Sequence, residues 1–289
     1  MAEKTIRILE SPSKVKQYDR CEMLMQMQYK ERWEPRIASR SLPARLGGTA
    51  FAKATELIHS QLMVSPRAIV SDLEPIEKAI DLFTRQWAYC QEKGIEMPLD
   101  RDAIIKTELR RVISRYAKET PLRGWTITHV EHAVKEYGIR MDVAGIDLEG
   151  NYAIGEVKYK ASLDERYRNS TIEEYGQDHQ FHQYYKVWRT LFPTQLPLYI
   201  YLILVSGTPQ KIHTPRFTYD ERFLDRWMVD TAAKSDRIKL IEDGSLEPEI
   251  STTHRDQFGW CPMKRACLEL GFDRSMMVHD YVQLDELPE

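Results

Sequence analysis

The sequence is short of several features that would assign it to a specialised class of protein. It has only 4 cysteines in 289 residues, which argues against a small domain held together by disulfides. It has no apolar run of 18 residues, so no membrane span is expected. Its net charge is -3, so it lacks the basic excess of a general nucleic-acid binder. Any contact with DNA must therefore come from a local basic cleft.

The opening segment, MAEKTIRILE, lacks the apolar core of a secretory signal, and we expect a cytoplasmic protein. No internal repeat or low-complexity segment is evident. The apolar run at 196–205 predicts a central strand that is buried on both faces. We predict a single α/β domain over 1–289. Its core is expected at about 45–215, with an N-terminal helix at 11–30 and a C-terminal segment at 216–289 packed on it.

Residues 138–160 (GIRMDVAGIDLEGNYAIGEVKYK) predict two strands joined by a tight turn at 148–150. Gly150 supplies the positive φ that a three-residue hairpin loop needs at its last position. Side chains alternate between the two faces of a strand. One face is apolar and small, which suits a core, and carries Met141, Val143, Gly145, Ala153, Gly155 and Val157. The other face is expected to be half buried, with apolar residues near the turn at Ala144, Ile146 and Ile154.

Four charged side chains gather at the far end of this second face. Folding the hairpin about Glu149 places Asp142 opposite Glu156 and Arg140 opposite Lys158. The two carboxylates would repel each other unless a cation lay between them, and the two cations favour an anion between them. Metal-assisted phosphodiester hydrolysis needs such groups: two carboxylates for a divalent metal, and cations that face phosphate. The alternative is a solvated strand end with unrelated charges.

Asp142, followed after thirteen residues by Glu156-Val157-Lys158, resembles the signature of the PD-(D/E)XK nucleases. The segment 138–142 (GIRMD) resembles their RecB-like branch, which includes the CRISPR adaptation nucleases and the nuclease modules of bacterial recombination helicases. The resemblance implies a restriction-endonuclease-like fold, a mixed central β-sheet flanked by helices. It also implies that Asp142, Glu156 and the main-chain carbonyl of Val157 bind Mg²⁺ or Mn²⁺ and that Lys158 assists catalysis.

Residues 48–59 predict a helix that carries Glu56, a further candidate metal ligand. In the family this helix usually reads Gly-x-x-apolar-His-x-x-apolar-Glu, and Ala52 stands where the metal-binding histidine is expected. That departure puts a histidine ligand in doubt and leaves Glu56 as a candidate. His59 lies farther along a similar face of the helix, and we interpret it as a surface or packing residue.

Three more candidates follow from the same resemblance. Glu131 resembles a glutamate that the family places on the strand before the hairpin, where it would support the site. Gln180 and Tyr184 lie four residues apart on a predicted helix and therefore share a face. The pair resembles a Gln-x-x-x-Tyr motif that contacts DNA beside the metal, and Arg140 is the candidate contact to phosphate.

Cluster-bearing relatives place one cysteine on the first helix and three near the C-terminus, spaced Cys-x-x-Cys-x-x-x-x-x-Cys. Cys21, Cys261 and Cys267 match three of these positions, and Phe258 stands at the fourth. A [4Fe–4S] cluster normally takes four thiolates, so a cluster here would need another ligand. We favour the interpretation in which the three thiols pack the two ends of the chain together as buried side chains.

These patterns together predict a metal-dependent deoxyribonuclease. The resemblance implies an exonuclease on DNA ends or single strands, in recombination, repair or replication, with recombination or replication proteins as partners. Two alternatives stay open. A sequence-specific endonuclease has the same core, although the chain shows no separate recognition domain. A non-catalytic DNA-binding or helicase-partner subunit would keep the fold; Ala52 favours that alternative, whereas Asp142, Glu156 and Lys158 oppose it.

Overall fold

The computed structural model describes residues 10–38, 41–193, 196–249, 255–256, 259–261, 263–270, 273–285 and 287–288. Within these ranges, no helix is both long enough and apolar enough to cross a lipid bilayer.

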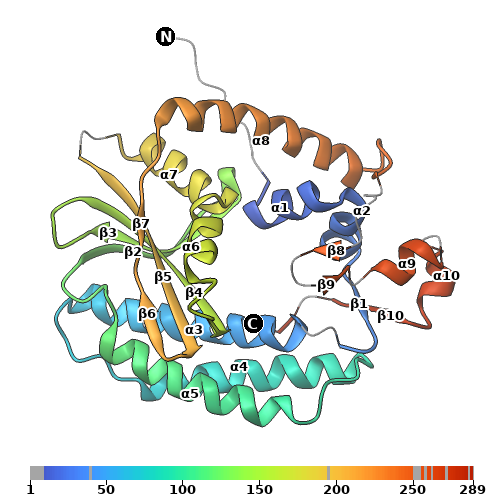
Figure 1. The fold of residues 1–289 in the computed structure, drawn as a ribbon, viewed down its shortest axis with the longest axis horizontal. Coiled ribbons are helices and arrows are strands. Elements are labelled where there is room, and N and C mark those ends of the chain that lie inside the picture. The colour runs from blue at the N-terminus through green and yellow to red at the C-terminus, as the bar shows by residue number, and fades with distance from the viewer. Residues whose placement is uncertain are drawn as a thin grey trace.

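A six-stranded mixed sheet forms the centre of the molecule (Figure 1). Its strands are β2 (Thr126–Val134), β3 (Ile139–Ile146), β4 (Tyr152–Ser162), β5 (Leu198–Thr208), β6 (Lys211–His213) and β7 (Arg216–Phe217). The order is β2-β3-β4-β5-β6, and β7 also pairs with β5. β4 and β5 are parallel, whereas the other neighbours are antiparallel. A parallel pair needs a crossover, and α6 (Arg168–Gly176) and α7 (His179–Leu191) provide it.

Three long helices cover one face of the sheet (Figure 1). They are α3 (Ser41–Val64), α4 (Leu73–Glu92) and α5 (Arg101–Glu119). α3 begins before and ends after the predicted 48–59. Phe51 and Ile58 of α3 pack in one core with Val143 and Val157 of the sheet. The apolar residues of α4 recur every three or four positions, which is why this helix buries one stripe against its neighbours.

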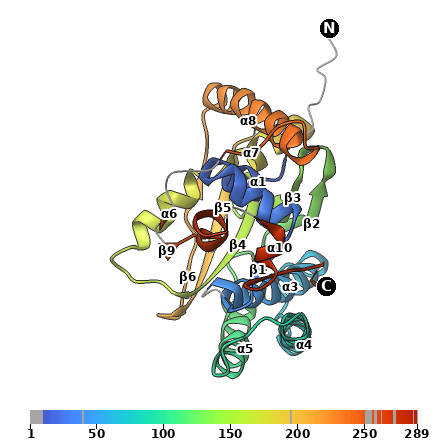
Figure 2. The same cartoon turned by 90° about the vertical axis from the view of Figure 1, so that its right-hand side faces the viewer.

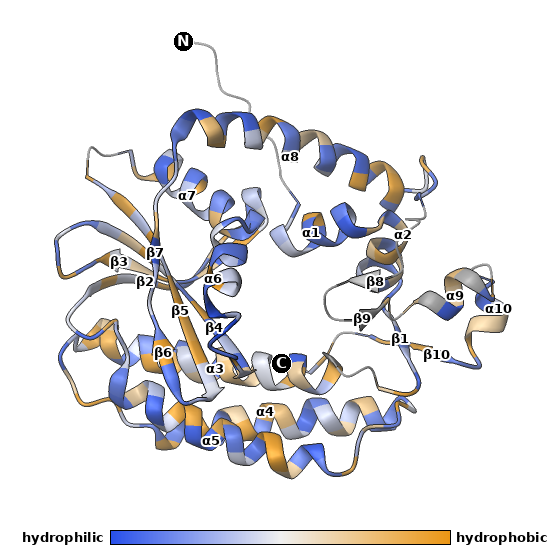
Figure 3. Ribbon diagram, viewed as in Figure 1, coloured by the Kyte–Doolittle hydropathy of each residue, from blue (hydrophilic) through white to orange (hydrophobic). Residues whose placement is uncertain are grey.

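The other face of the sheet is covered by α7 and α8 (Glu221–Glu242), as Figure 2 shows from the side. Ala144 and Ile154 are fully buried in this second core, whereas Arg140 at the far end of the same face is exposed, which agrees with the expected half-buried face. β5 confirms the predicted central strand, and it is drawn largely in orange in Figure 3. Met141 belongs to the second core and Val143 to the first, so the predicted alternation of faces breaks between them.

The two ends of the described chain pack together at one side of the sheet. The elements are α1 (Pro12–Arg20), α2 (Glu22–Met25), a π-helical turn (Gln26–Lys30), β1 (Trp33–Pro35), β8 (Arg255–Asp256), β9 (Gly259–Trp260), α9 (Lys264–Leu268), α10 (Arg274–Met277) and β10 (Tyr281–Gln283). A 3₁₀ turn (Lys135–Tyr137) lies elsewhere, between β2 and β3. β1 pairs with β10, which joins the two ends directly. The predicted helix at 11–30 forms in pieces, because Cys21 is extended (φ -170°, ψ 120°) between α1 and α2.

Candidate active site

The hairpin of β3 and β4 has the predicted register over its turn-proximal half. The pairs run from Ile146–Tyr152 to Val143–Gly155. Gly150 has a φ of 83°, which confirms the predicted turn. A Cβ at Gly155 would lie 2.7 Å from a methyl carbon of Val143, so glycine lets the two strands approach here.

Followed away from the turn, the pairing of β3 with β4 ends at Val143, the residue next to Asp142. The predicted pairs of Asp142 with Glu156 and of Arg140 with Lys158 therefore do not form. Instead, Oδ2 of Asp142 accepts a hydrogen bond of 2.8 Å from the main-chain N–H of Val157. A side-chain carboxylate thus replaces main-chain pairing at this point, which is the physical reason for the correction.

Arg140 contacts β2 through both its main chain and its side chain. Its main chain pairs with Ala133, and its Nε lies 3.0 Å from Oε2 of Glu131. Arg140 thus faces an acid on β2, and an anion between Arg140 and Lys158 stays a prediction. Glu131 has a φ of 50°, a left-handed conformation that costs a non-glycine residue about 1–2 kcal/mol. The Arg140 side chain is 71% exposed, so it is open to solvent beyond this ion pair.

Asp142, which is partly buried, and Glu156, which is buried, are two carboxylates close to each other. Glu156 is 2% exposed; its Oε1 accepts hydrogen bonds from Gln180 Nε2 (2.7 Å) and from Lys158 Nζ. Its Oε2 is buried and has no hydrogen-bond partner among the described residues. Burial raises the pKa of Asp142 well above its usual value, and the charge of Glu156 adds to the effect. Two such carboxylates and an orphaned oxygen favour a cation at this position.

Lys158 supplies the positive charge nearest to this pair. Burial disfavours its charged form, but Glu156 and Asp142 outweigh that cost and raise the pKa of Lys158 above its usual value. The ammonium is therefore protonated at neutral pH in this arrangement. That state suits a group that offsets negative charge better than one that abstracts a proton.

Gln180 and Tyr184 lie on one face of α7, as predicted, and reach the same site. Gln180 Nε2 bonds to both Glu156 and the Tyr184 hydroxyl. The Tyr184 hydroxyl donates to the main-chain carbonyl of Arg140. Tyr184 is only 1% exposed, and burial, followed by the nearby Glu156 and Asp142 charges, raises its pKa well above the usual value. The pair thus ties α7 to both strands of the hairpin, and a contact of Tyr184 with DNA stays a prediction.

Glu56 and Glu131 complete a group of acids around the hairpin. Glu56 lies on α3, where Lys53 Nζ is 2.7 Å from its Oε2. Burial raises the pKa of Glu131; Arg140 opposes this, and the charges of Glu56 and Glu156 add to it. That coupling brings the carboxylates of α3, β2 and β4 into one electrostatic environment. Ala52, by contrast, is an exposed alanine with no donor for a metal.

The expectation that His59 is a surface or packing residue missed a polar contact. His59 is fully buried, and its Nε2 lies 2.9 Å from the hydroxyl of Tyr116 on α5. The imidazole also lies beside the main-chain carbonyl of Asp142. The available signal was its position: His59 falls next to Ile58 in the apolar stripe of the helix, where a polar side chain needs a partner.

The residues at this site fit a hard divalent cation. In the described part of the chain, no three His, Cys, Asp or Glu side chains lie close enough together to bind a metal by themselves. Mg²⁺, however, usually binds through one or two carboxylates and takes its other ligands from water and substrate phosphate. Asp142 and the orphaned Oε2 of Glu156 meet that requirement.

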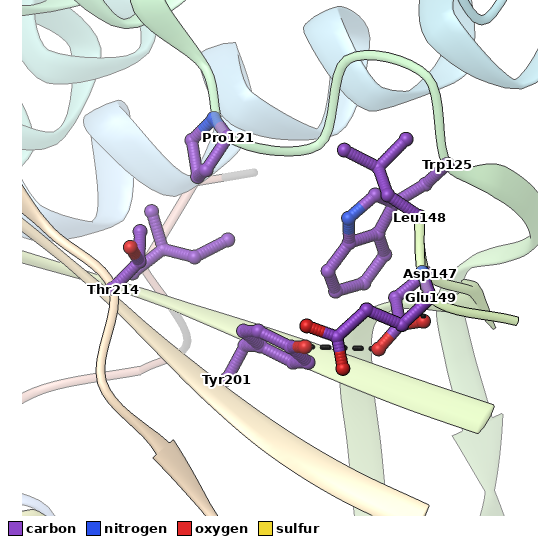
Figure 4. Close-up of a pocket in the computed structure, with 8 residues that line it drawn as sticks. Pro121, Trp125, Asp147, Leu148, Glu149, Tyr201 and Thr214 are labelled. Carbon is purple, nitrogen blue, oxygen red and sulfur yellow. Dashed lines mark hydrogen bonds between the residues drawn. The ribbon is translucent and has the colours of Figure 1, made fainter. Parts of the chain in front are cut away.

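A separate small cavity lies at the turn of the hairpin and contains none of the predicted site residues (Figure 4). It has a volume of about 190 Å³ and is lined by Pro121, Trp125, Asp147, Leu148, Glu149, Tyr201, Ile203 and Thr214. Inside it, the Tyr201 hydroxyl donates to Oδ2 of Asp147 over 2.9 Å. Asp147 follows Asp142 by five residues, roughly 16 Å along a strand, so this cavity is distinct from the carboxylate site.

Cys21, Cys261 and Cys267 lie against one apolar cluster that joins the two ends of the chain. Burial raises the pKa of both C-terminal thiols, and the proximity of Cys21 adds to it. The cluster contains Leu24, Met27, Trp33, Met263, Ala266, Met277 and Tyr281. Phe258, which stands at the fourth expected ligand position, lies outside the described residues. The thiols therefore take part in packing the two chain ends, and an iron–sulfur cluster stays untested.

Comparisons with known proteins place these residues in a family context. The model of the PD-(D/E)XK nuclease superfamily matches residues 10–268, which include every residue of the carboxylate site. Among solved structures, a protein from Eubacterium rectale that carries the provisional description of an exonuclease is similar, with 15% sequence identity and a TM-score of 0.46. The similarity covers 91% of each chain. No curated protein matches the sequence.

Proposed function

Because the chain belongs to the PD-(D/E)XK nuclease superfamily, we propose that it is a metal-dependent deoxyribonuclease that acts as an exonuclease on DNA ends or single strands. Its place would be in recombination, repair or replication, beside proteins of those processes. Its fold is the restriction-endonuclease-like fold of the family, a mixed central sheet flanked by helices.

The observation that supports the proposal most strongly is the pair of neighbouring carboxylates, Asp142 and Glu156. Asp142 and Glu156 lie together where β3 and β4 stop pairing, and Glu156 retains a buried oxygen without a partner. A protein that needed these charged groups only for stability would gain from apolar side chains instead, because such a replacement is often neutral or stabilises a fold by about 1–4 kcal/mol. The arrangement is explained if it serves to bind a cation.

Asp142, Glu156 and the carbonyl of Val157 would hold Mg²⁺ or Mn²⁺, with Glu56 as a further candidate ligand. The ion would polarise the scissile phosphate and lower the pKa of an attacking water. Lys158, protonated and in contact with Glu156, would offset the negative charge that develops on the phosphate.

Gln180 keeps the Glu156 carboxylate in place through its 2.7 Å hydrogen bond, and its half-buried side chain would also contact a DNA strand. Arg140 is the most exposed cation of the set and would contact the DNA backbone. Tyr184 would hold the Gln180 side chain and the main chain of Arg140 in place, because its hydroxyl is hydrogen-bonded to both.

The experiment is a cleavage assay on three substrates in Mg²⁺ or Mn²⁺: end-labelled single-stranded DNA, end-labelled duplex and closed circular duplex. We expect both linear substrates, or the single strand alone, to be shortened from an end while the circle stays intact. Glu156→Gln should be inactive, whereas Glu149→Gln should keep wild-type activity, because Glu149 is an exposed turn residue paired with Arg216. Cleavage of the circle would favour an endonuclease instead.

One observation favours a second candidate, a non-catalytic DNA-binding subunit. Ala52 removes the histidine that the family usually places on this helix, and an exposed alanine cannot replace it as a ligand. The same assay separates the two functions. A non-catalytic subunit would shift labelled DNA in a binding gel and leave all three substrates intact in either metal.

A further inference from the structure

His59 and Tyr116 form a buried polar pair behind the carboxylate site. His59 comes from α3 and Tyr116 from α5, both side chains are fully buried, and their polar atoms lie 2.9 Å apart. Their rings meet edge to face with centroids 5.9 Å apart. An imidazole in an apolar core costs free energy to desolvate, so packing alone would be better served by leucine. The pair therefore calls for an explanation beyond helix packing.

The second nitrogen of His59 points to that explanation. Its Nδ1 is buried and has no hydrogen-bond partner in the described structure, and the main-chain carbonyl of Asp142 lies beside the ring. Asp142 has no paired residue on β2 or β4, although Met141 and Val143 on either side of it pair with β2. The pairing of the strands is thus interrupted at Asp142, and His59 lies beside the main-chain carbonyl at this interruption.

We propose that His59 is a positioning residue that holds the main chain of Asp142 through Nδ1–H while its Nε2 accepts from the Tyr116 hydroxyl. The proposal rests on the proposed function, in which the Asp142 carboxylate binds a divalent cation. Two supports then act on Asp142: His59 fixes the main chain, and the N–H of Val157 fixes the carboxylate. A ligand held at both points binds a metal more tightly, because less conformational freedom is lost on binding.

The protonation state of the ring agrees with this role. Burial lowers the pKa of His59 to about 3, so the imidazole is neutral at physiological pH. A neutral imidazole has one donor and one acceptor nitrogen, which is what the carbonyl of Asp142 and the hydroxyl of Tyr116 require.

His182 on α7 offers a matched control. It too is buried, with an Nδ1 that has no hydrogen-bond partner in the described chain, and burial lowers its pKa to about 4. Its ring, however, packs edge-on against Tyr219, Phe223 and Trp227, which lie on and before α8, and not against the hairpin. Replacement of His182 should therefore report the cost of losing a buried histidine without a change at Asp142.

The test measures the dissociation constant of Mn²⁺ by calorimetry without DNA, together with urea unfolding of each variant. We expect His59→Leu to raise the dissociation constant at least about tenfold, the usual effect of removing a group that supports a metal ligand. His182→Leu should stay within about twofold of wild type, although both variants lose stability. His59→Asn places an amide nitrogen near the position of Nδ1 and should bind Mn²⁺ more tightly than His59→Leu.

A folded His59→Leu with the wild-type dissociation constant would overturn the proposal, and so would a His59→Asn variant as weak as His59→Leu. If His59→Leu does not fold, Tyr116→Phe decides, because it removes only the hydroxyl that orients the ring. It should raise the dissociation constant, and an unchanged value overturns the proposal. Absence of Mn²⁺ binding by the wild type would instead count against the proposed function itself.

Discussion

Replacement of Asp142 by asparagine should make the metal-free protein more stable. Its carboxyl group has a raised pKa because it is buried and, secondarily, because Glu156 lies close to it. A raised pKa in the folded state contributes stability below the unfolded pKa of about 4, and that contribution is lost as the pH rises through the folded pKa. Above the unfolded pKa the shift therefore counts against the fold, and its cost grows as the pH rises toward the folded pKa of Asp142.

The magnitude follows from the same linkage. Each unit of pKa difference corresponds to about 1.4 kcal/mol. Asparagine keeps the shape of aspartate and an oxygen that can accept from the N–H of Val157. We therefore expect Asp142→Asn to raise the free energy of unfolding by at least about 1 kcal/mol near pH 8 in EDTA, and by much less near pH 5.

The assay is urea unfolding in EDTA at the two pH values, with Asp147→Asn as a control of opposite sign. Burial opposes ionisation of Asp147 too, but the N–H of Asn151 and the hydroxyl of Tyr201 outweigh it and lower the pKa of Asp147. Asp147→Asn should therefore lose stability near neutral pH. An Asp142→Asn variant that is less stable than wild type in EDTA near pH 8, or equally affected at both pH values, would refute the reasoning.

Three further predictions follow from other parts of the site. Glu56→Ala should raise the Mn²⁺ concentration needed for half-maximal cleavage, and an unchanged requirement would show that Glu56 is not a ligand. Tyr184→Phe should cost about 1–3 kcal/mol of unfolding free energy in urea, because the carbonyl that its hydroxyl satisfies is left unpaired, and no loss would show that the hydrogen bonds are dispensable. Protein purified without oxygen should be colourless, whereas a brown protein with about four irons per chain would show that a ligand other than the three clustered cysteines had been recruited.

The hairpin illustrates what a local pattern can predict. Its turn and register follow from Gly150 and from the small residues that let the strands approach, and both depend on residues close in sequence. The buried strand at β5 follows from composition alone. The elements that cover the apolar residues of the second face could not be predicted in the same way, because α7 and α8 lie far along the chain.

The interruption of strand pairing at Asp142 could not be predicted from the sequence for a related reason. A strict register assigns Asp142 a cross-strand partner, whereas in the structure its carboxylate bonds to the main chain of Val157. The partner of Arg140 depends on β2, whose register shifts between Ile127 and His129 and whose Glu131 has a left-handed conformation. Such irregularities arise from tertiary packing, and they cannot be predicted from the spacing of residues within one hairpin.

His59 shows the same limit for a single side chain. Its partner Tyr116 lies 57 residues away on another helix, so the sequence offers a polar residue in an apolar stripe without showing what satisfies it. Burial of the stripe could be predicted from its period, but the contact with the main chain of Asp142 required the three-dimensional arrangement of α3 beneath the sheet.

The measurement that tests the central claim most directly is the single-turnover cleavage rate of a labelled single-stranded oligonucleotide in Mg²⁺ and in Mn²⁺. The wild type should cleave in at least one metal and stop in EDTA. Asp142→Ala and Lys158→Ala should each be slower by at least about 10²-fold while they keep the wild-type circular dichroism spectrum. Cleavage at the wild-type rate by either variant, or undiminished cleavage in EDTA, would contradict the assignment of the active site to the end of this hairpin.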